Sequence, residues 1–266
     1  MKVILLAGGL GTRLAEFTEV IPKPMVPIGG KPILWHIMQT YAHFGHKDFI
    51  LCLGYRGDII KKYFLNYDEC ISNDFVISNG GKDIKLYNSD IGDWTITFVD
   101  TGLNSNIGQR LKSVQHYLAN EEVFMANYAD GLTDLYLPRY LNHFVDHNKT
   151  ASFLCVKSSQ SFHVVSMADG NLVTEIAPVG KTGLWINGGF FIFKNEIFNY
   201  IQDGEELVQE PFQRLIDQKE LIAYKHEGFW ACMDTFKEKQ LFDDMEAKGI
   251  SPWAVWKPAY KNAQSK

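Results

Sequence analysis

The chain has 266 residues, of which 46% are hydrophobic and 21% charged, so it can bury a large core and is neither disordered nor collagen-like. Its 26 Lys and Arg against 31 Asp and Glu give a net charge of −5. No stretch concentrates basic residues on the scale of an arm that binds long nucleic acid, which excludes nucleic acid as an expected partner but allows a local pocket for a small phosphate compound.

Membrane and secretory signals are not expected either. No apolar run reaches the roughly 18 residues of a membrane span, and the apolar start of the chain is too short for a signal peptide. The four cysteines, at positions 52, 70, 155 and 232, lack the paired spacing of a metal site and the density of a disulfide scaffold. We therefore expect a cytoplasmic protein without a membrane partner.

Strands and helices alternate through the first 155 residues. Short apolar runs predict buried strands, and apolar residues at three-to-four spacing predict helices. In chain order we expect strands at 3–6, 48–53, 95–99, 122–126 and 151–156, with helices at 30–44, 58–67, 107–118 and 135–147. This alternation predicts an α/β fold with a Rossmann-like, mostly parallel mixed sheet flanked by helices.

The rest of the chain is richer in predicted strands. These are expected at 162–166, 172–176 and 185–193, followed by helices at 208–218 and 236–248. No linker rich in Pro, Gly or Ser interrupts the sequence, and we find no internal repeat. We therefore expect one domain with a β-rich region appended to the parallel sheet.

A glycine-rich loop follows the first predicted strand directly. Gly8, Gly9 and Gly11 would let backbone N–H groups approach an anion closely, and Arg13 adds a fork of donors. A dinucleotide-binding fingerprint requires a further glycine at position 14, which is Leu14, so that class is excluded. The remaining structural alternative is a tight strand-to-helix turn.

A lysine between two prolines follows this loop. Pro22 and Pro24 hold Lys23 on a stiff, extended segment, which directs a compact positive charge to a fixed place. Taken alone, a Pro-Lys-Pro segment more often forms an exposed loop. Its position soon after the glycine loop is what makes the combination specific.

The combination Gly-Gly-Leu-Gly-Thr-Arg-Leu followed by Pro-Lys-Pro-Met resembles the signature of the sugar-1-phosphate nucleotidylyltransferases. Segments 29–38, 54–57, 98–102, 186–191 and 230–235 resemble the glucose-1-phosphate cytidylyltransferase branch of that family, and the resemblance extends to about residue 253. It implies a fold of the nucleotide-diphospho-sugar transferase type. Within a single domain, 1–266, it implies a nucleotide-binding half (1–155), a β-rich acceptor-binding half (156–235) and a C-terminal helical segment (236–266).

The resemblance also implies nucleotidyl transfer in nucleotide-sugar biosynthesis. An acceptor phosphate oxygen would attack the α-phosphorus of CTP in line, and pyrophosphate would leave, a reaction that depends on alignment and charge neutralisation. The triphosphate would be held by the loop residues Gly8, Gly9, Gly11, Thr12 and Arg13. Lys23 would balance charge around the α-phosphate and the leaving group.

Two aspartates are implied as ligands of the Mg²⁺ cofactor. Asp130 follows the predicted strand 122–126, at the edge where ligands of a parallel sheet collect, and Asp234 lies near the C-terminal helix. Without the resemblance, Asp130-Gly131 would be a turn and Asp234 the N-cap of a helix starting at Phe236. The N-cap and the ligand role are compatible for Asp234.

The remaining implied contacts are spread along the chain. Residues placed near the base and triphosphate by the resemblance are Thr101, Gly108 and Arg110. Residues placed near the acceptor are Tyr128, Glu175, Lys181 and Asn187.

The acceptor side departs from the family pattern. The family has a Glu-Lys-Pro segment whose lysine holds the acceptor phosphate, but here Glu175 is followed by Ile176. Lys181 is the nearest replacement. Either the loop brings Lys181 to the same phosphate, or the acceptor is a phosphorylated small molecule other than glucose 1-phosphate.

Two further alternatives and one expectation concern the whole protein. The same fold could use UTP, dTTP or GTP, against which the cytidylyltransferase-like segments argue. A non-catalytic relative could bind nucleotide sugars, although such a binder has no need of both aspartates. Relatives commonly assemble, so we expect a homo-oligomer, with the aromatic stretch 253–256 as a candidate contact.

Overall fold

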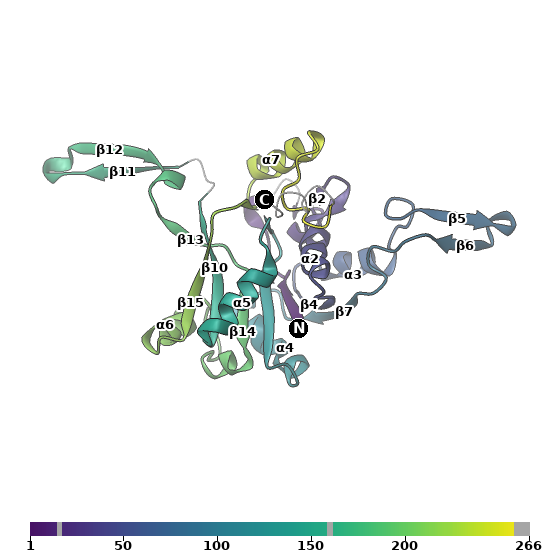
Figure 1. Cartoon of the computed structure of the whole chain (residues 1–266), viewed down its shortest axis with the longest axis horizontal. Helices are drawn as coiled ribbons and strands as arrows, with labels where there is room; N and C mark the ends of the chain where they lie inside the picture. The colour runs from purple at the N-terminus through teal and green to yellow at the C-terminus, as the bar shows by residue number, and fades with distance from the viewer. Residues whose placement is uncertain (15–17, 159–161, 258–266) are drawn as a thin grey trace.

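The computed structural model describes residues 1–14, 18–158 and 162–257 (Figure 1). Its centre is an eight-stranded sheet in the order β13-β10-β14-β8-β1-β4-β7, with β15 paired to β10. The first half of the chain supplies β1 (Lys2–Leu6), β4 (Asp48–Leu53), β7 (Thr95–Asp100) and β8 (Val123–Tyr128), which are mutually parallel. The α/β class predicted from the sequence is thereby confirmed.

The second half of the chain extends the same sheet. Strand β14 (Phe191–Lys194) is antiparallel to β8 and to β10 (Ala151–Lys157). Strand β10 also pairs with two more strands. Its pairing with β13 (Trp185–Asn187) is antiparallel, and its pairing with β15 (Leu221–His226) is parallel. The sheet is therefore mixed, as expected, and it runs without interruption through both halves of the chain.

Helices cover both faces of this sheet. One core cluster packs α2 (Ile33–His43), α3 (Gly57–Leu65), α5 (Leu137–His147) and α7 (Phe236–Ala247) on one face. A second cluster packs α4 (Ile107–Val114) and α6 (Glu210–Asp217) on the other. In β1, Val3 and Leu5 join the first cluster and Ile4 joins the second. A strand buried on both faces reads as a continuous apolar run, which is why it was predictable.

The predicted strand 185–193 is interrupted. Gly189 and Phe190 both have positive φ, +76° and +49°, and they separate β13 from β14. The Phe190 N–H donates to Asn127 Oδ1 at 2.9 Å, which holds this unusual backbone in place. A left-handed conformation is strained for Phe and rarely adopted, so a break at that residue could not be predicted.

Two hairpins project from opposite sides of the body (Figure 1). One is β5 (Phe75–Ser78) with β6 (Asp83–Leu86), and the other is β11 (His163–Met167) with β12 (Val173–Pro178). We call them the β5–β6 arm and the β11–β12 arm. The first was not predicted, nor were β15 and the short strands β9 (Gly131–Thr133) and β16 (Trp230–Cys232).

The C-terminal stretch corrects one expectation. Trp253, Ala254 and Val255 are buried within their own chain, where Trp253 packs against Phe242 of α7 and His36 of α2. They therefore belong to the core rather than to a subunit contact. No helix in the described part of the chain is both long and apolar enough to cross a membrane.

Candidate active site

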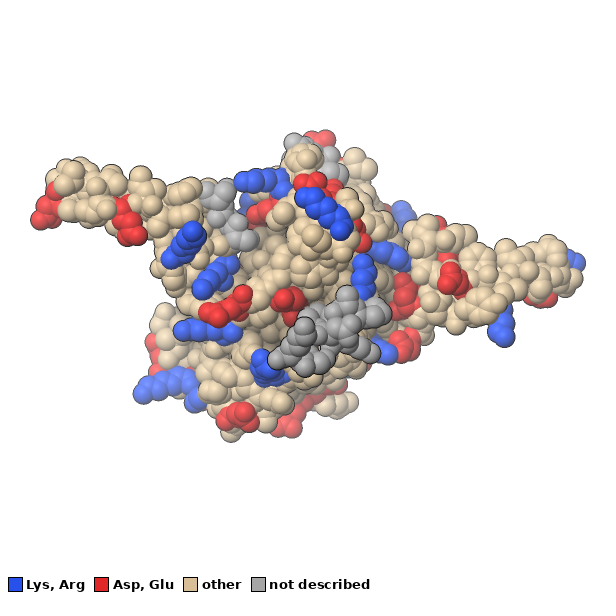
Figure 2. All heavy atoms as spheres, turned by 45° about the horizontal axis from the view of Figure 1, so that its top comes forward, with Lys and Arg blue, Asp and Glu red and all other residues tan. Residues whose placement is uncertain are grey.

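A cleft of about 230 Å³ opens at the carboxyl ends of β1 and β8, which are adjacent because Leu6 pairs with Tyr128. The N-terminus lies at the lower edge of the sheet in Figure 1, so the parallel strands point their carboxyl ends upward. Figure 2 brings that edge forward and shows acidic and basic side chains close together over the body. The cleft is lined by Leu6, Ala7, Gly9, Gly11, Thr12, Arg13, Lys23, Pro24, Tyr128, Ala129 and Asp130.

The glycine loop needs its glycines for separate reasons. Gly11 has φ +65°, a conformation that glycine adopts without strain. Gly9 has no atom within 4 Å of where a Cβ would lie, so its side of the loop is open. A Cβ on Gly8 would lie 2.0 Å from Arg110 Nη1, so that position is filled from below. The loop is thus fixed from beneath and open toward the cleft.

Lys23 lies between the two predicted metal ligands. Its Nζ donates to Asp130 Oδ2 and to Asp234 Oδ1, each at 2.5 Å, and the lysine side chain is only 12% exposed. Arg13 Nη1 forms an ion pair with Asp234 Oδ2 at 3.0 Å. Burial alone would lower the pKa of Lys23, but the adjacent carboxylates outweigh it and raise the pKa above its ordinary value. Lys23 is therefore held as a cation.

A small antiparallel pair brings the two aspartates together. Strands β9 and β16 pair so that Cys232 lies opposite Gly131, and the Met233 N–H donates to Asp130 O at 2.8 Å. Asp234 precedes the N-cap of α7, which is Thr235. The Glu238 carboxylate accepts the N–H groups of both Asp234 and Thr235, at 2.7 and 2.9 Å. The expected N-cap role thus falls one residue later, which leaves the Asp234 carboxylate directed at Lys23.

The donor chemistry fits a hard divalent cation. Two carboxylates from separate elements converge on one positive centre, and carboxylate oxygens are the ligands that Mg²⁺ prefers. Within the described ranges, no group of three or more His, Cys, Asp and Glu side chains converges in this way. A bound Mg²⁺ would therefore take its other ligands from phosphate oxygens and water, as is usual for this ion.

Arg110 lies beneath the loop rather than in the cleft. Its guanidinium is buried and donates to Gly8 O, Leu53 O and Thr101 Oγ1, at 3.1, 3.1 and 2.7 Å. The Thr101 hydroxyl donates in turn to Leu53 O. Gly108 is also buried, since a Cβ there would lie 2.4 Å from Glu205 O. The structure therefore places Arg110, with Thr101 bonded to it, behind the glycine loop, and it packs Gly108 against the segment of Ile201 and Glu205. Their predicted contact with the nucleotide stays a prediction.

Tyr128 lines the cleft, and the Asn187 side chain lies beside it. Burial raises the pKa of Tyr128, as do the nearby charges of Glu206 and Asp130, whereas a hydrogen bond with the Asn187 side chain opposes the shift. The phenol is therefore neutral and can donate or accept a hydrogen bond. Glu206, which sequence reasoning did not single out, is brought here by the segment before α6.

Glu175 and Lys181 are not brought to the cleft. Glu175 lies on β12 and is exposed on the β11–β12 arm, paired with Ser166. Lys181 lies in the short 3₁₀ turn Val179–Lys181 at the base of that arm and is also exposed. Their predicted contact with the acceptor stays a prediction.

The cleft can therefore bind a polyphosphate. It combines an open glycine loop, two cationic side chains and a carboxylate pair suited to Mg²⁺, at the sheet edge where α/β proteins bind ligands. Nothing among its lining residues is a Ser–His or Cys–His pair of the kind used in covalent catalysis. Fold and site together define a nucleotide-binding transferase.

Comparison with known proteins agrees. A model of the nucleotidyl transferase family matches residues 2–247, and the chain belongs to that family. The glucose-1-phosphate cytidylyltransferase of Salmonella typhimurium is 40% identical over 257 residues, covering 96% of this chain and all of the relative. The "probable glucose-1-phosphate cytidylyltransferase" of Bacillus subtilis is 35% identical over 258 residues, with the same coverage of each chain.

Solved structures show the same fold at low identity. A UDP-glucose pyrophosphorylase complexed with UDP-glucose has a TM-score of 0.67 at 15% identity, covering 93% of this chain and 98% of that one. HddC from Yersinia pseudotuberculosis complexed with GMP-PN has a TM-score of 0.65 at 20% identity, covering 92% and 99%. The predicted nucleotide-diphospho-sugar transferase type of fold is thereby confirmed.

Proposed function

We propose that the chain transfers CMP from CTP to a sugar 1-phosphate, releasing pyrophosphate and giving a CDP-activated sugar. The observation that carries this proposal is the Lys23 ammonium held between Asp130 and Asp234 beside an open glycine loop. The near full-length relatives named glucose-1-phosphate cytidylyltransferase support the choice of CTP and of a sugar 1-phosphate.

The residues of the cleft have separate roles in the transfer. Backbone groups of Gly9, Gly11 and Thr12 bind the triphosphate, and Arg13 and Lys23 neutralise charge on the α-phosphate and the leaving pyrophosphate. An oxygen of the acceptor phosphate forms the new bond to the α-phosphorus, while the bond from that phosphorus to the bridging oxygen of the leaving group breaks. No protein base is required, since the attacking phosphate oxygen is already ionised.

The carboxylates of Asp130 and Asp234 hold the cofactor that this reaction needs. Mg²⁺, when bound there, supplies charge neutralisation at the triphosphate. Lys23 then no longer faces both carboxylates alone and can turn its ammonium toward phosphate oxygens.

We also propose that the protein is cytoplasmic and a homo-oligomer. Each arm carries apolar cross-strand pairs on one face: Ile77 opposite Ile84 on one, and Val165 opposite Ile176 on the other. All four side chains are exposed. A two-stranded hairpin is marginally stable alone in water, so a second copy of the chain packed on these faces accounts for their composition.

The function is tested by pyrophosphate release with Mg²⁺ and each of CTP, UTP, dTTP and GTP, against glucose 1-phosphate and other phosphorylated acceptors. We expect turnover with CTP and a sugar 1-phosphate. Turnover with another triphosphate alone would overturn the cytidylyl assignment. Binding of CTP without turnover on any acceptor would instead identify a non-catalytic relative.

A further inference from the structure

The acceptor side of the cleft continues onto the last strands of the sheet. Strands β10 and β15 are parallel to β8, so their carboxyl ends reach the same edge as Asp130, and the antiparallel β13 begins there. Going outward from β1, the sheet continues with β8, β14, β10 and β15, and β13 pairs with the carboxyl end of β10 at residues 155–157. Side chains at this end of β10, β13 and β15 thus border the acceptor.

Two lysines surround one tryptophan at this place. Lys157 at the end of β10 pairs with Trp185 at the start of β13, and its Nζ lies 5.6 Å from the Trp185 ring. Lys225 of β15 pairs with Cys155, yet its Nζ lies 5.3 Å from the same ring, so the side chain reaches across β10 toward β13. Because Cys155 also pairs with Asn187, all of these side chains share one face with Asn187.

These side chains have little counter-charge around them. Trp185 is half-buried and belongs to neither core cluster. Lys157 pairs at 3.8 Å with Glu227, whose side chain is 75% exposed, so that attraction is weak. Among the residues that the structure describes, no carboxylate forms an ion pair with Lys225. Two ammonium groups therefore share one ring without sufficient counter-charge.

The surroundings add positive charge. Figure 2 shows Lys and Arg side chains gathered on the body at the base of the left-hand arm, which is the β11–β12 arm of Figure 1. Lys181 lies in that region, because its neighbour Gly180 approaches Ser158 O, directly after Lys157. An anion placed between these side chains would meet several donors, and Glu227 is the carboxylate that pairs with them.

We infer that Lys157, Lys225 and Trp185 bind a second anionic group of the acceptor, which is thus a sugar 1-phosphate carrying a further phosphate or carboxylate at its far end. The inference rests on the proposed function, since the anomeric phosphate must face Lys23 and Asp130. Strand β10, which carries Lys157, is two strand spacings, about 10 Å, from β8, and β15, which carries Lys225, lies one spacing further, so both lysines face the distal end of the sugar. The Trp185 ring offers a face on which the sugar stacks.

The test compares three probes that differ only at this end: glucose 1-phosphate, glucose 1,6-bisphosphate and glucuronic acid 1-phosphate. Titration calorimetry measures binding of each to the full chain, and pyrophosphate release with CTP measures turnover. We expect one or both doubly anionic probes to bind roughly ten- to a hundredfold more tightly than glucose 1-phosphate. Comparison of the bisphosphate with the uronic acid 1-phosphate tells whether the distal group is a phosphate or a carboxylate.

Variants assign the effect to residues. Lys157→Gln and Lys225→Gln should each raise Kd and KM for the preferred probe about tenfold, leaving KM for CTP and binding of glucose 1-phosphate unchanged. Lys225→Arg should retain the preference. The matched control is Lys61→Gln, on the exposed side of α3.

Failure of this inference can be told apart from failure of the proposed function. If glucose 1-phosphate binds and turns over as well as the other probes, and both Gln variants leave this unchanged, the second anionic site is overturned while cytidylyl transfer stands. If no probe turns over with CTP, the proposed function fails. In that case the binding measurements still test the second anionic site, and equal Kd values for all three probes would overturn that site.

Discussion

At the scale of single residues, Lys23 separates two carboxylates, and we propose that the same side chain neutralises charge in the reaction. We expect Lys23→Met to lower kcat with CTP by at least about a hundredfold, through loss of charge stabilisation at the triphosphate. The variant should also unfold at lower temperature, since Asp130 and Asp234 then face each other without the ammonium.

Magnesium distinguishes these two roles. Millimolar Mg²⁺ should raise the Tm of Lys23→Met more than that of the wild-type chain, because in the variant the ion replaces the missing positive charge. The measurement is thermal unfolding with and without Mg²⁺, with Ca²⁺ for comparison. An equal rise in both chains would contradict the assignment of these carboxylates to a cation.

His36 makes stability depend on pH. Its imidazole is buried beside Trp253, Nε2 donates to Ile28 O at 2.9 Å, and burial lowers its pKa to about 4. A lowered pKa means that stability is complete above about pH 6.5, the unfolded value, and is lost as pH falls toward 4, where the folded chain must take up the proton. At pH 5 the loss from this group is about 2 kcal/mol.

Urea unfolding at pH 7.5 and pH 5 checks this. In His36→Asn the difference in unfolding free energy between the two pH values should be smaller than in the wild-type chain by about 2 kcal/mol. The exposed His116→Asn is the control and should leave the difference unchanged. An unchanged difference in His36→Asn would place the pH sensitivity elsewhere.

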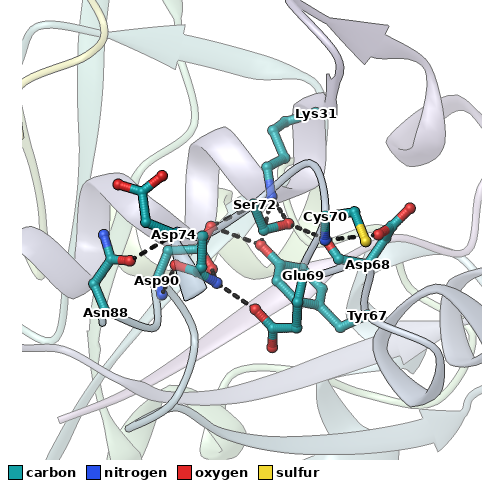
Figure 3. Close-up of polar contacts among 10 residues, drawn as sticks. Lys31, Tyr67, Asp68, Glu69, Cys70, Ser72, Asp74, Asn88 and Asp90 are labelled. Atoms are coloured by element: carbon teal, nitrogen blue, oxygen red, sulfur yellow. Dashed lines mark hydrogen bonds and ion pairs between the residues drawn. The ribbon is translucent and has the colours of Figure 1, made fainter. Parts of the chain in front are cut away.

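At the scale of elements, a partly buried polar network fastens the β5–β6 arm to the body (Figure 3). Lys31, just before α2, donates to Tyr67 and Ser72 and forms an ion pair with Asp90 at 3.3 Å. The Tyr67 hydroxyl donates to Asp90 at 2.7 Å, and the Asp90 N–H donates to Asn73 Oδ1. The segments before β5 and after β6 are thus joined at one lysine, which orients the arm.

We expect Lys31→Met to destabilise the chain by about 1–3 kcal/mol, because Asp90 and Tyr67 lose a partly buried charged partner. Amide hydrogen exchange should rise selectively over residues 67–90. The control is Lys47→Met, which removes the exposed pair with Asp93 and should cost less than about 1 kcal/mol. Uniform exchange across the chain in Lys31→Met would show that the network does not hold the arm.

Short elements explain what the sequence could not predict. Strands β1 and β4 are buried on both faces, and α2 repeats apolar residues at helical spacing, so their residues alone specify them. Strands β9 and β16 have three residues each, too few for a pattern, although their pairing sets the distance between the two aspartates. The β5–β6 arm was not predicted, and the strands of the β11–β12 arm were predicted without their projection from the body. In both arms the side chains face solvent, so no pattern of buried residues marks them.

In the site, too, residues that are close in sequence could be predicted, and residues that only the fold brings together could not. Gly11, Arg13 and Lys23 are close in sequence and could be recognised together, and the structure brings them to one cleft. Arg110 was expected near the nucleotide but lies beneath the loop, since its hydrogen bonds join segments far apart in the chain. Lys157 and Lys225 meet only through the pairing of β10, β13 and β15, which no local pattern reveals.

At the scale of the whole molecule, the two arms predict an assembly. The double variant Val165→Glu/Ile176→Glu places charges on the apolar face of the β11–β12 arm, and we expect it to reduce the molecular mass measured by light scattering on a sizing column. Far-UV circular dichroism should not change. Ser166→Glu, on the opposite face of the same hairpin, is the matched control. A wild-type mass equal to one chain would contradict the proposed homo-oligomer.

The packing of Arg110 under the glycine loop restricts which sequences can replace this one. Its guanidinium fills the space where a side chain at Gly8 would begin. Enlarging Gly8 first would collide with the arginine, and shortening the arginine first would leave that space empty and remove one hydrogen bond each from the carbonyls of Gly8 and Leu53. Each single step is harmful although a paired change could be tolerated, so these distant positions can vary only together, and a library that changes one position at a time would reject them all.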